Sequence, residues 1–359
     1  MSGVFVHGLG AVSPAGWGLA ALRDALAKGD AVPTQPLARE GWPRPLPHHT
    51  VPAPNPRPPF LNHARLRRAS PISHYAVAAG LEALGSDAAR IQAGQLRLGV
   101  VLCVMSGCVS YSRRFYDETL KDPATASPLV FPETVFNAPA SHLAAVLNAT
   151  SINYTLVGDP GTFLQGLALA AQWLLAERVD GCVVIGAEEP DWLTAEAFRL
   201  FGRNSVVSSG SGALYLRADH DPAALAELAA VSEPHNYSCG VSRREALRRV
   251  RVELGPGESR ALLCDSRVGL PLHDAAETAA WSDWPGARLS PKALLGEGLA
   301  AASAWQCVAG IDTLARGGCS SAAISVAGCN QQAIGARFQA CPTAGQIPPS
   351  VPTSDGEAT

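Results

Sequence analysis

The stretch from residue 151 to residue 187, SINYTLVGDPGTFLQGLALAAQWLLAERVDGCVVIGA, determines the fold class of this chain. It begins with a strand-like run at Ile152–Val157, continues with a helical pattern at Thr162–Glu177 and ends with an apolar run at Gly181–Ala187. A helix between two short strand-like runs is typical of a βαβ unit, in which the helix connects two parallel strands. The stretch therefore predicts an α/β fold.

The alternation of strands and helices continues towards the N-terminus. Strand-like runs occur at Val4–Val6 and Leu98–Met105, and helical patterns occur at Gly18–Lys28, Ala64–Leu84 and Ala138–Leu147. Between them, the segment Val32–Pro59 is rich in proline and has no periodic pattern, so we expect a surface loop there.

The part towards the C-terminus repeats this plan more loosely. Strand-like runs occur at Gly212–Arg217, Ala261–Asp265 and Ser320–Ala327, and helical patterns occur at Ala223–Ala230 and Leu294–Leu314. Because both parts share one rhythm, we predict two pseudo-duplicated βαβ halves, spanning residues 1–203 and 204–338. The proline-rich segment 339–359, with its acidic end, is expected to be a disordered tail.

The composition points to an extensive subunit interface. The 359 residues are 47% hydrophobic and only 16% charged, whereas charged residues make up about 25% of a typical chain. Little of the surface can then be covered by charge. The alternative is a GC-rich genome, which would raise the content of alanine, glycine and proline without any interface.

Charge and cysteine content exclude several classes of function. The net charge is -3 and there is no run of lysine and arginine, so we expect neither a nucleic-acid partner nor membrane insertion. No signal peptide is recognisable, so a cytoplasmic location is expected. The nine cysteines include no CxxC pair and are expected to be reduced and buried. We therefore expect no metal and no cofactor.

Six short stretches resemble motifs of one enzyme family, in the same order and across nearly the whole chain. They are VFVHGLGAVSPAGWG from Val4, LRRASPISHYAVAAGLEAL from Leu66, SPLVFPETVFNAPASHLA from Ser127, DGCVVIGAEE from Asp180, PKALLGEGLAAASAWQ from Pro291 and AISVAGCNQQAI from Ala323. Together they resemble the β-ketoacyl synthases, a family of condensing enzymes. The resemblance implies a thiolase-like fold, in which two similar halves form a layered α-β-α-β-α body.

The resemblance also implies that the catalytic residues of the family are absent. The family uses a cysteine nucleophile and two histidines, and the matching positions hold Pro160, Ser266 and Glu297, while the family's lysine is retained as Lys292. The nucleophile's N–H is one of two oxyanion donors in the family, and proline has no N–H. The other oxyanion element is altered as well, because Val326 stands at the family's gatekeeping phenylalanine. We therefore expect no catalysis by this chain alone.

The substituted positions suggest structural uses. Asp159 is a good helix N-cap and Pro160 a favoured first helical residue, so we expect an ordinary helix start where the family has a strained elbow. Lys292 and Glu297 are five residues apart near a helix start and could form a salt bridge.

The segment CDSRVGLPLHDAAE, from Cys264, matches the family's first histidine motif only in part. Its end matches at Asp274 and Glu277, but the two threonines that contact the carrier arm in the family become Val268 and Leu270. Binding of a carrier arm is therefore in doubt.

A different active site can be imagined from the residues nearby. Cys264 and His273 flank the vacated histidine position and could form a shifted Cys/His pair. Against this, Cys264 ends an apolar strand, where a buried structural thiol is the usual outcome, and His273 is expected in the exit turn. His7 and His142 lie on apolar elements and are interpreted as structural histidines.

The resemblance favours a non-catalytic partner subunit. In type II polyketide systems an active ketosynthase subunit pairs with a chain-length factor, a homologue without the nucleophile. We predict such a heterodimer in polyketide biosynthesis, polyene pathways included, or in fatty-acid-like biosynthesis, with acyl carrier protein contacted through the partner. Two alternatives stay open: an acyltransferase or 3-oxoacyl-carrier-protein synthase with a non-standard active site, and a homodimeric scaffold pseudoenzyme.

Overall fold

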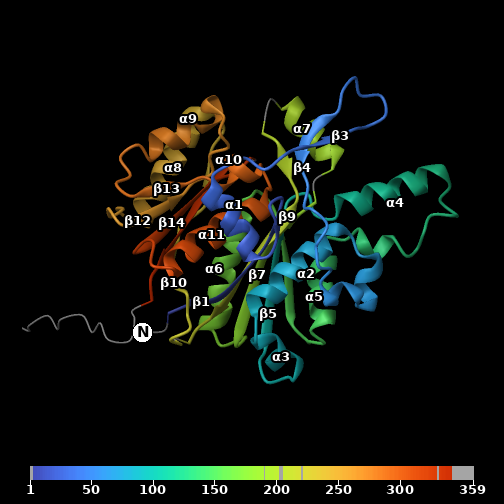
Figure 1. The fold of residues 1–359 in the computed structure, drawn as a ribbon, viewed down its shortest axis with the longest axis horizontal. Helices are drawn as coiled ribbons and strands as arrows, with labels where there is room; N and C mark the ends of the chain where they lie inside the picture. Colours follow the sequence, from blue (N-terminus) through green and yellow to red (C-terminus); the bar gives the residue numbers. More distant parts are fainter. Residues whose placement is uncertain (1–2, 190, 202–204, 220, 330, 342–359) are drawn as a thin grey trace, which may run out of the picture.

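In the described residues, the main sheet network has twelve strands, ten of which follow one another in a continuous order while β2 and β11 pair at its side (Figure 1). The computed structural model describes residues 3–189, 191–201, 205–219, 221–329 and 331–341. In spatial order, the first half of the network contains β6 (Ile152–Val157), β5 (Leu98–Val104), β7 (Gly181–Glu188), β9 (Gly210–Arg217) and β1 (Phe5–Ser13). The second half contains β13 (Ala287–Leu289), β12 (Ala261–Cys264), β14 (Ser321–Ala327), β15 (Gln332–Gln339) and β10 (Ala226–Val231).

The two halves of the network have the same topology. When the five strands of each half are numbered in chain order, they lie side by side in the order three, two, four, five and one in both halves. The second strand is parallel to the third and fourth in both, and the fifth is antiparallel to the fourth and the first. Antiparallel pairing of β1 with β10 joins the halves. The predicted pseudo-duplication is confirmed, and in this topology the second half begins after β9, at β10, rather than near residue 204.

Helices form three layers around the two halves of the network. The central layer holds α6 (Thr162–Leu175) and α11 (Ala300–Ala315), which contact strands of both halves. One outer layer holds α2 (Pro71–Leu84) and α5 (Ala138–Val146), and the other holds α8 (Gly240–Leu254) and α9 (Pro271–Ala280). The predicted α-β-α-β-α body is confirmed (Figure 1).

The sequence of α11 explains its central position. Fourteen of its residues are buried, among them Trp305, which donates from Nε1 to the carbonyl oxygens of Val12 and Ser211. Small residues let the helix approach the first half closely, because a Cβ atom added at Gly212 would lie 2.7 Å from the Cβ of Ala304. A helix that is apolar on all sides is stable only when it is covered on all sides.

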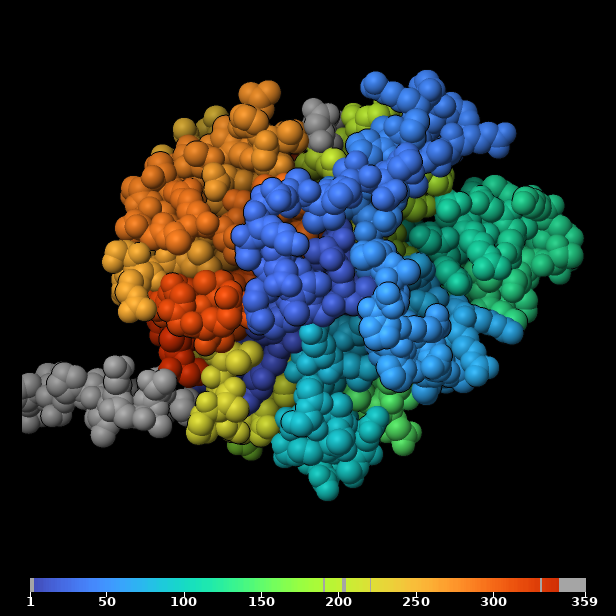
Figure 2. Space-filling model, viewed as in Figure 1, coloured from blue at the N-terminus to red at the C-terminus, as the bar shows by residue number. Residues whose placement is uncertain are grey.

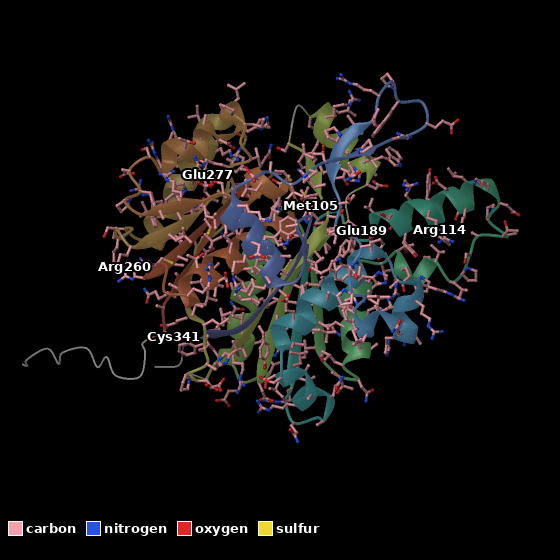
Figure 3. The ribbon with its side chains drawn as sticks, viewed as in Figure 1. Met105, Arg114, Glu189, Arg260, Glu277 and Cys341 are labelled. Atoms are coloured by element: carbon pink, nitrogen blue, oxygen red, sulfur yellow. The ribbon has the colours of Figure 1, made fainter. Side chains whose placement is uncertain are left out.

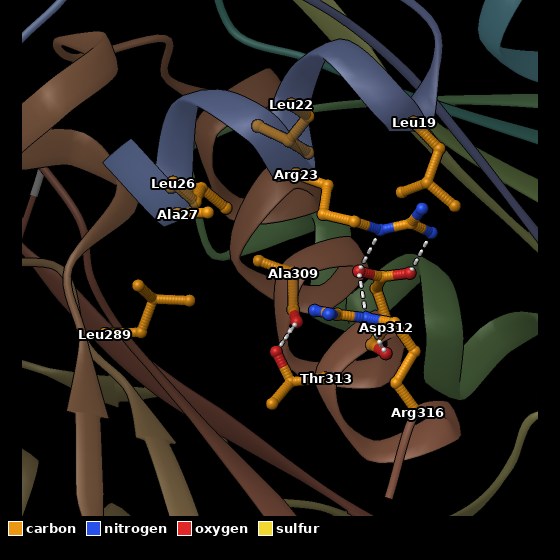
Figure 4. A pocket seen from close by; sticks show the side chains of 10 residues that line it. All are labelled: Leu19, Leu22, Arg23, Leu26, Ala27, Leu289, Ala309, Asp312, Thr313 and Arg316. Carbon is orange, nitrogen blue, oxygen red and sulfur yellow. Dashed lines mark hydrogen bonds and ion pairs between the residues drawn. The ribbon is translucent and has the colours of Figure 1, made fainter. Parts of the chain in front are cut away.

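The first helix, α1 (Leu19–Lys28), packs beside α11. Arg23 donates hydrogen bonds of 3.0 and 2.7 Å to the two carboxylate oxygens of Asp312, which also pairs with Arg316. Figure 4 shows this ion pair at the side of a cavity of about 170 Å³ between the two helices.

The remaining elements are short or peripheral. They are α3 (Asp87–Gln92), α4 (Val109–Lys121), α7 (Trp192–Leu200), α10 (Pro291–Leu295), the 3-10 helices η1 (Pro59–Asn62), η2 (Ala64–Arg68) and η3 (Phe131–Glu133), and the strands β2 (Gly16–Trp17), β3 (Gln35–Leu37), β4 (Leu46–His49), β8 (Val207–Ser208) and β11 (His235–Asn236). None of the helices in the described residues combines the length and apolar character needed to span a membrane.

Two predicted elements differ in kind from the structure. The prediction of a helix at Ala223–Ala230 was wrong, because most of this segment forms β10. This strand pairs with β1 on one side and with β15 on the other. Pairing on both edges overrides the helical preference of alanine. The predicted loop at Val32–Pro59 contains β3 and β4, which form a small sheet with β8.

Two long helical patterns are interrupted. Ala64–Leu84 is divided into η2 and α2, since Pro71 cannot continue a helix and begins a new one. Leu294–Leu314 is divided into α10 and α11 by a turn at Gly296. Of the predicted tail 339–359, residue 339 ends β15 and residues 342–359 lie outside the described part of the chain.

Candidate functional site

Ser266, which the sequence motifs aligned with the first family histidine, lies two residues after the end of β12 and is buried. Its hydroxyl donates to the carbonyl of Ser325 (2.9 Å) and accepts from the amide of Ala327 (3.1 Å). Gln306 lies 3.5 Å away. The hydroxyl is therefore occupied in linking β12 to β14, and a serine cannot take the imidazole's part in proton transfer.

Beside Ser266 lies Glu277, which is almost fully buried on α9 (Figure 3). One carboxyl oxygen accepts from the Ser266 amide (3.0 Å) and from the Ser325 hydroxyl (2.8 Å). Burial, reinforced by the negative charge of Asp265, raises the pKa of Glu277 to about 7. Its contacts are those of a residue that holds the loop after β12 in place.

Glu297, which the sequence motifs aligned with the second family histidine, forms a buried ion pair with Lys292. The Nζ atom of Lys292 lies 2.9 Å from one carboxylate oxygen of Glu297, and only 1% of the lysine side chain is exposed. The other oxygen accepts from the amide of Leu299 at 2.9 Å. The predicted salt bridge is confirmed, and it occupies both groups.

Pro160 is buried in the turn between β6 and α6, but the local prediction was wrong in detail. Gly161 is the residue before the first turn of α6, and no side chain caps the helix. The Asp159 carboxylate instead accepts from the amide of Gln332 at 3.1 Å and lies 3.7 Å from the Sγ atom of Cys329. Tertiary contacts with Cys329 and with Gln332 at the start of β15 have replaced the expected N-cap, and the turn has no positive φ at Asp159 or Pro160.

Two of the three residues that the sequence motifs aligned with the family's catalytic residues share one small cavity. Ser266 and Glu297 line it, and Pro160 and Val326 do not. Val326 is fully buried on β14 in the central core. The other lining residues come from four separate regions and are Phe198, Ser205, Arg243, Val268, His273, Asp274, Ala327, Gly328 and Cys329. The cavity measures about 30 Å³, which is room for one or two water molecules.

Arg243 and Cys329 had not been predicted as residues of this site. Cys329 lies within the stretch AISVAGCNQQAI, which the family resemblance had already marked, so that motif could have found it. Arg243 lies on α8, and nothing in the sequence near it indicates the cavity. Its guanidinium also lies 5.8 Å from the ring centre of Tyr237.

The imagined Cys264/His273 pair is separated in the structure. Cys264 is fully buried in the core around α11, and burial raises its pKa well above the usual value. His273 lies on α9, not in an exit turn, and faces the small cavity. No hydrogen bond between described residues joins them.

His7 and His142 have the structural contacts expected of them. His7 lies 3.1 Å from the carbonyl oxygen of Asp219, and the buried His142 lies 2.9 Å from Glu133.

Comparison with known proteins identifies the fold. No family model matches the sequence, and no curated protein matches it significantly. Among solved structures, a β-ketoacyl synthase from Burkholderia phymatum STM815 aligns with a TM-score of 0.78 at 16% identity, over 95% of this chain and 100% of that one. The ishigamide ketosynthase/chain length factor aligns with a TM-score of 0.74 at 19% identity, over 94% and 99%.

A third structure, AntDE:AntF, a type II polyketide synthase acyl-carrier protein in complex with its ketosynthase, aligns with a TM-score of 0.75 at 14% identity, over 95% and 100%. The chain therefore has the thiolase-like fold of ketosynthases, as the sequence motifs predicted. At these identities the likeness concerns the fold alone.

Proposed function

We propose that this chain is a non-catalytic ketosynthase homologue that assembles with an active ketosynthase as a chain-length-factor-type subunit. The pathway class is type II polyketide or fatty-acid-like biosynthesis. In this role the chain completes the partner's dimer interface and helps to bound the space in which the growing acyl chain lies.

The observation that carries the proposal is the condition of the three catalytic positions. Pro160 offers neither a thiol nor an N–H, the Ser266 hydroxyl is occupied by main-chain groups, and Glu297 is paired with Lys292. Loss of one oxyanion donor alone costs about 100- to 1,000-fold in rate, and loss of the nucleophile removes covalent catalysis. The remaining cavity of about 30 Å³ is too small for an acyl group on a carrier arm.

An unpaired sheet edge supports assembly with a second subunit. β6 is the last strand of its half, and no strand in the described residues pairs with its outer edge. Its side chains Tyr154 and Val157 are 48% and 53% exposed. Natural proteins normally cover or charge such edges.

Further exposed apolar residues lie on the segment of the chain between β5 and β6. Six large apolar side chains between residues 116 and 136 are at least 41% exposed, namely Tyr116, Leu120, Leu129, Phe131, Val135 and Phe136. They lie on α4, on η3 and in the segments after them, which project from the body in Figure 2. Arg114, labelled in Figure 3, marks the same projection. An apolar surface of this extent is typical of a subunit interface.

The base of the projection is fixed by buried carboxyl groups. Glu188 accepts hydrogen bonds from the amides of Met105, Ser106 and Gly107, and Glu189 accepts from the amides of Ile72 and Ser110. These contacts hold the start of α4 against the body (Figure 3). The apolar surface is thus presented on a preorganised segment, which lowers the entropic cost of association.

The partner interface can be tested by mass measurement. The chain is co-expressed with the ketosynthase encoded nearest to it, and the product is analysed by size-exclusion chromatography with light scattering. We expect a one-to-one heterodimer, and we expect Tyr154→Arg with Val157→Arg on β6 to dissociate it. Leu272→Arg is the matched control, because Leu272 is 94% exposed but lies on α9, away from β6. A homodimer that ignores the ketosynthase, or a complex that the β6 variant leaves intact, would contradict the proposal.

A further inference from the structure

A second exposed surface lies on α8, far from β6. In Figure 1, α8 lies at the opposite side of the molecule from α4. A groove of about 510 Å³ runs along its outer face and along the segment before it. The groove is lined by Pro234, His235, Asn236, Cys239, Val241, Ser242, Arg244, Glu245, Ala246, Arg248 and Arg249.

The charged side chains that line this groove are mostly positive, whereas the chain as a whole has a net charge of -3. Arg244, Arg248 and Arg249 line it with one carboxylate, Glu245. Arg249 has only a long 3.9 Å contact with Glu245, and both side chains are more than half exposed. In the described part of the chain, Arg244 and Arg248 form no ion pair.

The inner face of α8 explains why these arginines are held in one place. Ala246, Leu247, Val250 and Leu254 are buried against the second half of the sheet network. The arginines therefore stand on a helix whose position is fixed by the core. Arg244 and Arg248 are one helical turn apart, so their side chains share a face.

Exposed apolar side chains border the arginines. Val241 is 70% exposed near the start of α8 and Val252 is 79% exposed near its end. Arginine together with exposed apolar side chains is typical of protein interfaces. A site for a small phosphate compound would instead hold its arginines converging in an enclosed pocket.

We infer that the outer face of α8 is a docking surface for an acidic helical segment of another protein, whose carboxylates pair with Arg244 and Arg248 and whose apolar side chains cover Val241. This surface is independent of the β6 edge, so a subunit bound at β6 leaves it free. The inference stands or falls separately from the proposed function.

Cys239 provides a built-in reporter for the groove. It is exposed, it lines the groove, and hydrogen bonds from Ser242 lower its pKa. Seven of the other eight cysteines are buried, and Cys341 is partly exposed. Iodoacetamide should therefore alkylate Cys239 first, and a ligand in the groove should slow this reaction.

The experiment uses the full chain and a fluorescein-labelled 18-residue helical peptide with glutamates spaced four residues apart and leucines on the neighbouring face. Binding is followed by fluorescence anisotropy, and alkylation of Cys239 is followed by mass spectrometry. We expect saturable binding that weakens several-fold between about 50 and 200 mM salt, because exposed charges are screened. We also expect slower alkylation of Cys239 in the complex.

Variants locate the binding surface. Arg244→Glu with Arg248→Glu should weaken binding at least tenfold, whereas Arg244→Lys with Arg248→Lys should retain most of it. In the matched control, the three exposed arginines of η2, Arg65, Arg67 and Arg68, are each replaced by glutamate. This variant should bind the peptide as well as the unmodified chain does. All positions are exposed, and circular dichroism verifies folding.

The inference is overturned by the absence of saturable binding, by equal loss in the η2 control, or by equal binding of a peptide with the same composition in scrambled order. It is also overturned if inorganic phosphate at millimolar concentration protects Cys239 as well as the peptide does, which would indicate a small-anion site.

Discussion

The turns that begin α6 and α11 occupy equivalent places in the two halves, yet they have opposite backbone character. In chain order, each helix follows the third strand of its half and precedes the fourth strand. Before α6, Asp159 and Pro160 have ordinary backbone conformations. Before α11, Leu299 has a φ of 52° and a ψ of -121°, which non-glycine residues avoid.

The difference shows how two equivalent turns can be stabilised in different ways. The α6 turn has a proline, which fits a relaxed conformation and cannot donate a hydrogen bond. The α11 turn keeps a strained residue because Glu297 binds the Leu299 amide and Lys292 in turn neutralises Glu297. Local strain persists only where the surroundings determine it.

The largest expected effect comes from breaking the buried ion pair. Lys292→Met leaves the Glu297 carboxylate buried without its partner, which should lower the free energy of unfolding by about 3 to 5 kcal/mol. The double variant Lys292→Met with Glu297→Leu should recover much of this loss. Urea denaturation measures both. The control is Arg23→Met, since Asp312 keeps Arg316 and the pair is partly exposed, so about 1 kcal/mol or less should be lost.

The buried Glu277 should make stability depend on pH. Its folded-state pKa is about 7, whereas an unfolded glutamate titrates near pH 4.3. The folded state therefore holds the proton more tightly, and the contribution to stability falls as pH rises from about 4.3 through 7. Relative to Glu277→Gln, the native chain should lose on the order of 2 kcal/mol between pH 5 and pH 7. An unchanged difference between the two proteins across this range would refute the assignment.

The strained turn can be tested by comparing two truncations of Leu299. Both remove a fully buried side chain and should cost several kcal/mol. Glycine normally destabilises more than alanine, but at a positive φ it relieves strain, so Leu299→Gly should be more stable than Leu299→Ala by about 1 kcal/mol. Thermal unfolding of the two variants decides between these orders. The reverse order would show that the turn is not strained.

The smallest expected effect is at the relaxed turn. Pro160→Ala should change the free energy of unfolding by less than about 1 kcal/mol, because the backbone conformation suits both residues. Pro160→Cys introduces a thiol at this turn without introducing a histidine nearby. Intact mass after incubation with an acyl-carrier substrate should show no acylation. Acylation of this variant would mean that the site needs only the thiol.

The helices and strands that could be predicted from the sequence are those whose side chains are largely buried, because their runs of apolar residues are easy to recognise. The strand–helix–strand stretch ending at Ala187 was predicted well because its helix and second strand are largely buried. β10 was missed because its partners lie more than 100 residues away in the chain. α8 was missed although Leu247, Val250 and Leu254 have helical spacing, since its many arginines obscure the apolar face.

The site was predictable only where its residues are close in sequence. The Lys292–Glu297 pair could be expected from its spacing near a helix start. Cys329 reaches the cavity from the segment after β14 and Arg243 from α8 in the outer layer, so only the tertiary structure brings them together.

The product of the assembled pair tests the central claim most directly. The partner ketosynthase is assayed with acyl and malonyl carrier-protein substrates, alone and with this chain, and the products are compared by mass. The account predicts that adding this chain changes the length or the amount of the product while the chain itself carries no acyl group. Identical products in equal amounts without it, or acylation of this chain, would contradict the account.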